Sequence, residues 1–165
     1  MKSIFLKIIF FTTLLFIQNC KAQASNEYIN FYSEIASKLN TIVPNKTQFY
    51  GQNFSNFSNE LLTKNISIIR IGIDSKTDTS PTYHVLSLNF SDRNISLVAS
   101  ENEFQYPRIW ITFENEIPTP QILNMLKQYN GEWNASFAQF FANMKIEKIV
   151  FSGINGYNNT DRSLK

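Results

Sequence analysis

Apolar residues near the start of the chain recur every three or four positions, which is the period of an α-helix. The pattern begins after Asn26, whose side chain can cap a first turn. Pro44 is expected to stop the helix because it has no backbone N–H to donate. The apolar positions between these two residues are Ile29, Tyr32, Ile35, Ala36, Leu39 and Ile42.

The middle of the chain changes to the alternation of β-strands, in which every second residue shares a face. Residues 66–73 are rich in β-branched side chains and predict a covered strand, and residues 83–90 and 108–114 alternate clearly. The polar residues 91–94 have turn chemistry, so we predict a hairpin that leads into a strand over 95–99. One predicted face carries His84, Leu86, Leu88 and Phe90, and another carries Ile109, Ile111 and Phe113.

The C-terminal third returns to helical spacing. Thr119 followed by Pro120 is typical of a helix start, and Gly131 is typical of a helix end. A strongly aromatic helical face follows and is expected to pack into the core. Its members are Trp133, Phe137, Phe140, Phe141 and Met144. Residues 146–152 then predict a final strand.

This order of elements is helix, four strands, two helices and a strand. Strands that are grouped in the sequence favour antiparallel pairing, with helices packed on one face. We therefore predict a single α+β domain over residues 23–154, with an antiparallel sheet of about five strands. The polar residues 155–165 are predicted to form a flexible C-terminal tail.

Residues 1–22 carry the three parts of a secretory signal peptide in the expected order. Lys2 and Lys7 provide the positive start, residues 8–17 form an apolar run, and the small residues Cys20 and Ala22 fit a cleavage site. The run is shorter than the roughly 20 apolar residues that a membrane span needs. We expect an exported protein, periplasmic or extracellular, that is cut after Ala22; a cut after Ala24 also fits.

Cys20 leaves a second interpretation open. A bacterial lipoprotein signal ends in a small residue immediately before a lipidated cysteine, and Asn19 matches that position poorly. If Cys20 is acylated, the protein is an accessory protein that is lipid-anchored to the outer membrane. A membrane is expected as a partner only in that case.

Charge and composition narrow the functional classes. Of 15 Lys and Arg residues against 13 acidic ones, the signal removes three lysines and no acid, which leaves 12 against 13 and a net charge of −1. Without a basic excess, nucleic acid is not an expected partner. Cys20 and His84 are the only cysteine and histidine, which excludes a disulfide, Cys-ligated zinc and multi-His metal sites. We expect neither a metal nor a cofactor, although a site made of carboxylates alone stays open.

Two groups of residues suggest hydrolytic chemistry. His84 is the only histidine, and histidine is a common general base, although no motif supplies its partners. Paired carboxylates beside an aromatic ring resemble the arrangement of a glycosidase. Here four acids flank the predicted strand that carries Trp110, namely Glu101, Glu103, Glu114 and Glu116. A structural histidine and solvated edge charges explain both features without chemistry, so a small exported hydrolase is the alternative hypothesis.

Segment 49–57 mixes aromatic rings with amide side chains and one glycine, and its secondary structure has no clear period. If exposed, such rings would stack on a sugar or a peptide; if folded back, they would join the core. The rings are Phe49, Tyr50, Phe54 and Phe57. The leading hypothesis is a non-enzymatic exported domain that binds a protein or glycan partner, with any ligand contacting these rings.

The signal generates the first prediction. N-terminal sequencing of the exported product should begin at Gln23, because the cut after Ala22 has small residues at both recognition positions. A mature chain that begins at an acylated Cys20 would overturn this prediction and establish the lipoprotein instead.

Overall fold

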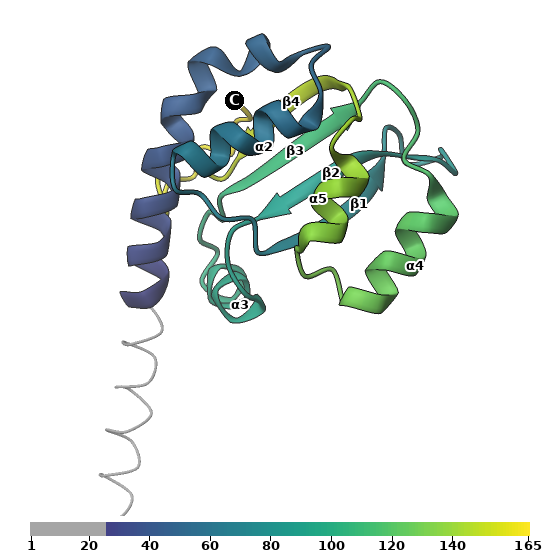
Figure 1. Cartoon of the computed structure of the whole chain (residues 1–165). Coiled ribbons are helices and arrows are strands. Elements are labelled where there is room, and N and C mark those ends of the chain that lie inside the picture. The colour runs from purple at the N-terminus through teal and green to yellow at the C-terminus, as the bar shows by residue number, and fades with distance from the viewer. Residues whose placement is uncertain (1–25) are drawn as a thin grey trace, which may run out of the picture.

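The chain forms one antiparallel sheet whose strands lie side by side in sequence order, β1-β2-β3-β4. The structure is a computed structural model that describes residues 26–165 (Figure 1). The cleavage sites and Cys20 lie outside these residues. The strands are β1 (Arg70–Ser75), β2 (Tyr83–Asn89), β3 (Arg108–Phe113) and β4 (Ile146–Ser152).

The helices are placed before and between these strands. The chain is helical over residues 26–42 and continues through the 3-10 helix η1 (Val43–Phe49) to α2 (Phe54–Thr63). Helix α3 (Arg93–Glu101) connects β2 to β3, while α4 (Thr119–Tyr129) and α5 (Ala135–Phe141) connect β3 to β4. None of the helices described here is long and apolar enough to cross a membrane.

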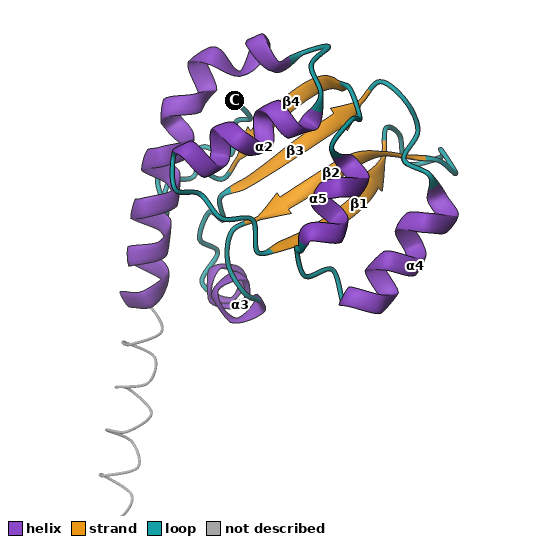
Figure 2. Cartoon of the chain, in the orientation of Figure 1, coloured by secondary structure: helices purple, strands orange, loops and turns teal. Residues whose placement is uncertain are grey.

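The register of the sheet places its apolar residues on one face. Two rows run across all four strands, and their members are almost completely buried apart from Ile73. The rows are Ile71, Leu88, Ile109 and Phe151, and Ile73, Leu86, Ile111 and Ile149. Figure 2 shows α2, α4 and α5 in front of the sheet. The predicted α+β class is therefore confirmed, with four strands rather than five.

The strand predicted over residues 95–99 is wrong, because these residues belong to α3. The Asp92 side chain caps the helix by accepting a 3.1 Å hydrogen bond from the Ile95 amide. Ile95, Val98 and Ala99 lie at helical spacing and face the core. The β-branched residues favoured a strand, but the cap and the spacing together favour a helix.

Two other predicted boundaries are corrected. Pro44 ends the α-helical period near residue 42 but does not end helical structure, because proline is compatible with the first turn of η1. The strand predicted over 66–73 begins only at Arg70. The Ile66 amide instead donates to Leu61 O, which ties this residue to the end of α2, and Ile66 is buried there.

The C-terminal segment lies against the domain. Buried Gln105 donates from Nε2 to Asn159 O and Asp161 O, at 2.9 and 2.7 Å. Tyr28 donates its hydroxyl to Gln105 O, and burial raises the pKa of this phenol, so it stays a donor. Lys165 pairs with Phe151 through both backbone groups. The flexibility predicted for residues 155–165 concerns motion and stays a prediction. The structure shows which parts of the domain these residues contact.

Both edges of the sheet are partly covered. Along β4, Gln52 O accepts from the Ile146 amide, and Lys165 bonds Phe151 further on. Along β1, residues 131–133 add a short antiparallel bridge, since the Ile71 amide donates to Gly131 O and the Trp133 amide donates to Ile69 O. Covered edges protect a sheet from pairing with other chains.

The packing of α5 generates the second prediction. Phe137 is completely buried, as the sequence predicted, so Phe137→Ala should lower the free energy of unfolding by about 3–5 kcal/mol. Gln139→Ala, an exposed position on the same helix, is the control and should stay within about 0.5 kcal/mol. Denaturant titration measures both. A loss below about 1 kcal/mol for Phe137→Ala would contradict the burial of this face.

Candidate functional site

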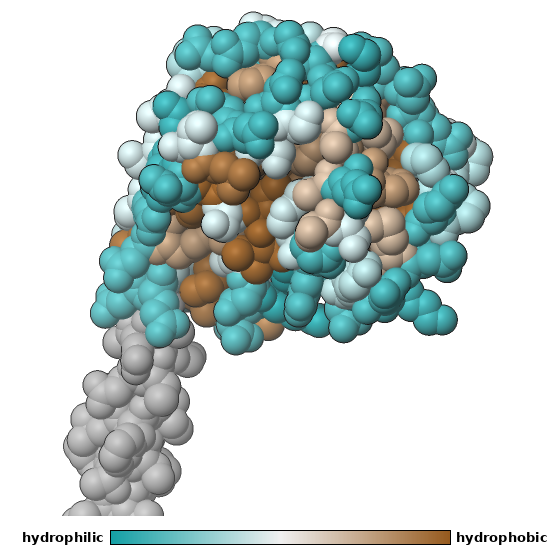
Figure 3. All heavy atoms as spheres, viewed as in Figure 1, coloured by the Kyte–Doolittle hydropathy of each residue, from teal (hydrophilic) through white to brown (hydrophobic). Residues whose placement is uncertain are grey.

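Hydrophobic surface gathers on the helical side of the molecule, between α2 and α5 and toward α3 (Figure 3). Near this region a cleft of about 810 Å³ opens at the end of the sheet where β1 begins. A cleft of this volume is in the range of small-molecule sites. Its lining comes from three segments, namely 68–70, 92–94 and 130–133.

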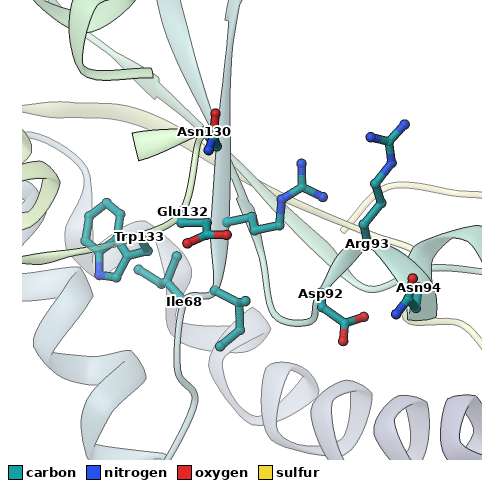
Figure 4. Close-up of a pocket in the computed structure, with 9 residues that line it drawn as sticks. Ile68, Asp92, Arg93, Asn94, Asn130, Glu132 and Trp133 are labelled. Carbon is teal, nitrogen blue, oxygen red and sulfur yellow. The ribbon is translucent and has the colours of Figure 1, made fainter. Parts of the chain in front are cut away.

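Two sides of the cleft differ in character. Asp92, Arg93 and Asn94 stand on one side, at the start of α3, while Glu132 and Trp133 stand on the other (Figure 4). Ile68 and Ile69 add an apolar wall, and Arg70 lies beside them at the start of β1. The cleft therefore combines an aromatic and aliphatic wall with charged and amide side chains.

Backbone geometry holds the Trp133 side of the cleft in place. Asn130 and Gly131 both have left-handed φ values, 53° and 71°, which turn the chain sharply after α4. A Cβ at residue 131 would lie 3.1 Å from Ile71 O, so glycine permits the bridge to β1. This bridge places Trp133 directly beside Ile69.

Packing fixes the Trp133 ring itself. It stacks on Phe137, with ring centroids 6.1 Å apart and an angle of 11° between the planes, and it lies near Phe141 at 6.5 Å. Phe54 meets it edge-on at 6.1 Å. Trp133 remains half-buried, so the ring combines a fixed position with an accessible surface.

The arginines of the cleft have no acceptor among the residues that the structure describes. Throughout residues 26–165, the guanidinium groups of Arg70 and Arg93 make neither an ion pair nor a hydrogen bond. The ion pairs there join Lys38 to Glu34, Lys64 to Glu60 and Lys76 to Glu147. Unpaired guanidinium groups are suited to carboxylates and phosphates because their N–H groups form a planar fork.

Two acids also line the cleft. The Asp92 carboxylate is occupied by the first turn of α3, where it accepts from the Ile95 amide. The positive end of that helix further offsets its charge. Glu132 is exposed, and its backbone rather than its carboxylate makes the contacts, with Asn134 Nδ2 donating to Glu132 O at 3.2 Å. The Glu132 carboxylate has no partner among the described residues either, so the unpaired charges of the cleft are two guanidinium groups and one carboxylate.

The aromatic segment 49–57 does not form this site. Phe49, Phe54 and Phe57 are buried, with exposures of 7%, 0% and 0%, so of the two interpretations left open by the sequence these rings follow the one in which they fold back into the core. Phe49 meets Phe57 edge-on within the core, at 5.1 Å. Tyr50 is half-buried and directs its hydroxyl to Ile149 O. The rings were drawn inward because α2 and η1 cover the core face of the sheet.

The groups considered for hydrolysis lie apart from the cleft. His84 is half-buried on β2, and its Nδ1 is buried without a hydrogen-bond partner among the described residues, so no carboxylate orients the ring there. All four acids flanking β3 are exposed. They fall at opposite ends of the strand, with Glu101 and Glu103 before it and Glu114 and Glu116 after it.

The open face of the sheet carries a second basic group, which is satisfied internally. Arg108 lies over the rings of Tyr106 and Trp110, with its central carbon 5.6 and 5.2 Å from their centroids. Its Nε donates to Asn89 Oδ1 at 2.9 Å. Tyr106 in turn stacks on Phe31 at 5.7 Å, which joins the helix over 26–42 to the sheet. These contacts give Arg108 a structural role.

Comparison of the chain with known proteins identifies no relative. No protein-family model matches the chain, and no curated protein or solved structure is significantly similar to it. Within the described part of the chain, His, Cys, Asp and Glu side chains form no cluster of three or more that could hold a metal ion.

Sequence reasoning missed the residues of the cleft. Arg70, Arg93 and Glu132 belong to no motif, and Trp133 was assigned to the core, which is correct for only part of its surface. The available signals were the Asp92 cap and the Asn130-Gly131 turn. Both mark places where the chain changes direction, at the end of the sheet where β1 begins.

The third prediction contrasts His84 with a fully bonded polar residue. His84→Leu should change the free energy of unfolding by less than about 1 kcal/mol, because a buried nitrogen without a partner is removed. Gln105→Leu should lose about 2–3 kcal/mol, because its bonds to the C-terminal segment are lost. Chemical denaturation measures both variants. A large loss for His84→Leu would indicate a stabilising role for the imidazole.

Proposed function

We propose that this protein is an exported, non-enzymatic binding domain whose cleft recognises an anionic group on a small ligand. The observation that carries the proposal is the pair of guanidinium groups, Arg70 and Arg93, which line the cleft without a carboxylate or carbonyl acceptor in the described residues. Export is supported by the signal pattern of residues 1–22.

The chemistry of the lining favours binding over catalysis. A hydrolase needs a nucleophile, or an acid and a base, within hydrogen-bond reach of a common point. The cleft offers guanidinium, carboxylate and amide groups. One of its two carboxylates, that of Asp92, caps a helix and is therefore not available as an acid or a base. His84 does not line the cleft. The arrangement is suited to holding a ligand by charge and by contact with Trp133.

The fourth prediction tests the arginines. Isothermal titration with inorganic phosphate at low salt should detect weak binding, and Arg70→Gln or Arg93→Gln should weaken it by about threefold to tenfold, because each removes a charged donor. Lys127→Gln, an equal charge change on exposed α4, is the matched control and should leave binding unchanged. Equal affinity in all four proteins would refute recognition by the cleft.

A further inference from the structure

A second cavity adjoins the cleft. It has a volume of about 280 Å³ and lies between the end of α2 and the start of α5. Ile68 and Trp133 line both cavities, so they form the shared wall at the junction. We call this second cavity the trough; its residues are Ser58, Leu61, Leu62, Ile66, Ser67, Ile68, Trp133 and Ala138.

The trough has a different chemistry from the cleft. It contains no charged side chain, and its only polar side chains apart from the indole N–H are the hydroxyls of Ser58 and Ser67. Leu62 is 62% exposed at its rim and adds accessible apolar surface to the trough. Figure 3 shows hydrophobic surface over the same region, between α2 and α5. Apolar material placed here would remove apolar surface from water on both sides.

One segment of the chain, residues 66–70, runs from the trough to the cleft. Residues 66–70 leave α2, pass along the trough at Ile66 and Ile68, and reach the cleft at Ile69 and Arg70. A ligand that follows this path meets apolar side chains first, then the Trp133 ring, and then the unpaired guanidinium groups. The order of the lining residues thus specifies the order of groups along the ligand.

We infer that the ligand is a single-chain amphiphile, with an anionic head held by Arg70 and Arg93 and an aliphatic tail lying in the trough. This inference rests on the proposed function, because it assigns the head group to the same cleft. Charge complementarity selects the anionic head, and the continuity of the two cavities through Ile68 and Trp133 selects the tail. Trp133 packs against the tail where it leaves the cleft.

Straight-chain carboxylates test the inference, with acetate, butyrate, hexanoate, octanoate and decanoate used below their micellar concentrations. The chain has two tryptophans, Trp110 and Trp133, so a Trp110→Phe background makes Trp133 the only reporter. The dissociation constant, followed by Trp133 fluorescence and checked by calorimetry, should fall by up to about fourfold for each added CH2 that enters the trough.

Matched variants separate the head from the tail. Leu62→Ser should flatten this dependence on chain length, and its high exposure allows the change without loss of the fold. Leu123→Ser, which is 45% exposed on α4 and lines neither cavity, is the control and should bind like the parent. Arg93→Gln should weaken every carboxylate by a similar factor and leave the dependence on chain length unchanged.

Contrary outcomes are distinguishable. If phosphate binds through the arginines but affinity does not depend on chain length, the amphiphile is refuted and the proposed function stands. If octanol binds as tightly as octanoate and Arg93→Gln has no effect, the anionic head is refuted, and the proposed function fails with it. If Leu62→Ser and Leu123→Ser behave alike, the tail does not occupy the trough and the inference is wrong.

Discussion

The contact on which the rest of the structure depends is the aromatic cluster around Phe141. The Phe141 ring lies nearly parallel to Phe113 of β3, with centroids 5.7 Å apart, and meets Phe54 of α2 at 6.1 Å. Trp133 completes the cluster at 6.5 Å. Because one group of rings joins the sheet, α2 and α5, the two helices are held at a separation that leaves residues 67–69 accessible between them. The trough and the Trp133 side of the cleft both follow from that separation.

The two faces of the sheet have different surroundings. One packs against the helices and forms the core, and the other is open to solvent. Its core face consists of two apolar rows under the helices, and its opposite face carries Arg108 between Tyr106 and Trp110. Loops and terminal residues cover part of each edge. The chain also changes direction at the end where β1 begins and β2 leads into α3. Side chains from distant segments converge there, as is usual for ligand sites built from loops.

Local patterns were sufficient for most of the fold. Alternation located β2 and β3 nearly to the residue, and the apolar run of residues 146–152 located β4. It failed at residues 95–99, where Ile95 and Val98 suit a strand or a helix, and the Asp92 cap decides for the helix. It also failed at Ile66, whose partner is Leu61 at the end of α2 rather than a neighbouring strand. These errors occur where tertiary contacts override a weak local preference.

The sequence by itself determined the α+β class, the core faces of β2 and β3 and the exclusion of sites built from cysteine or several histidines, and it is the only basis of the proposal that the protein is exported. Each of these depends on composition or on short-range periodicity. Only the tertiary structure decided which aromatic rings are buried and which charged residues line the same cleft. Arg70 and Arg93 are 23 positions apart and share a cleft because antiparallel pairing of β1 with β2 brings the start of one strand to the end of the other. Trp133 joins them through its bridge to Ile69, a contact between segments 64 residues apart that no local pattern encodes.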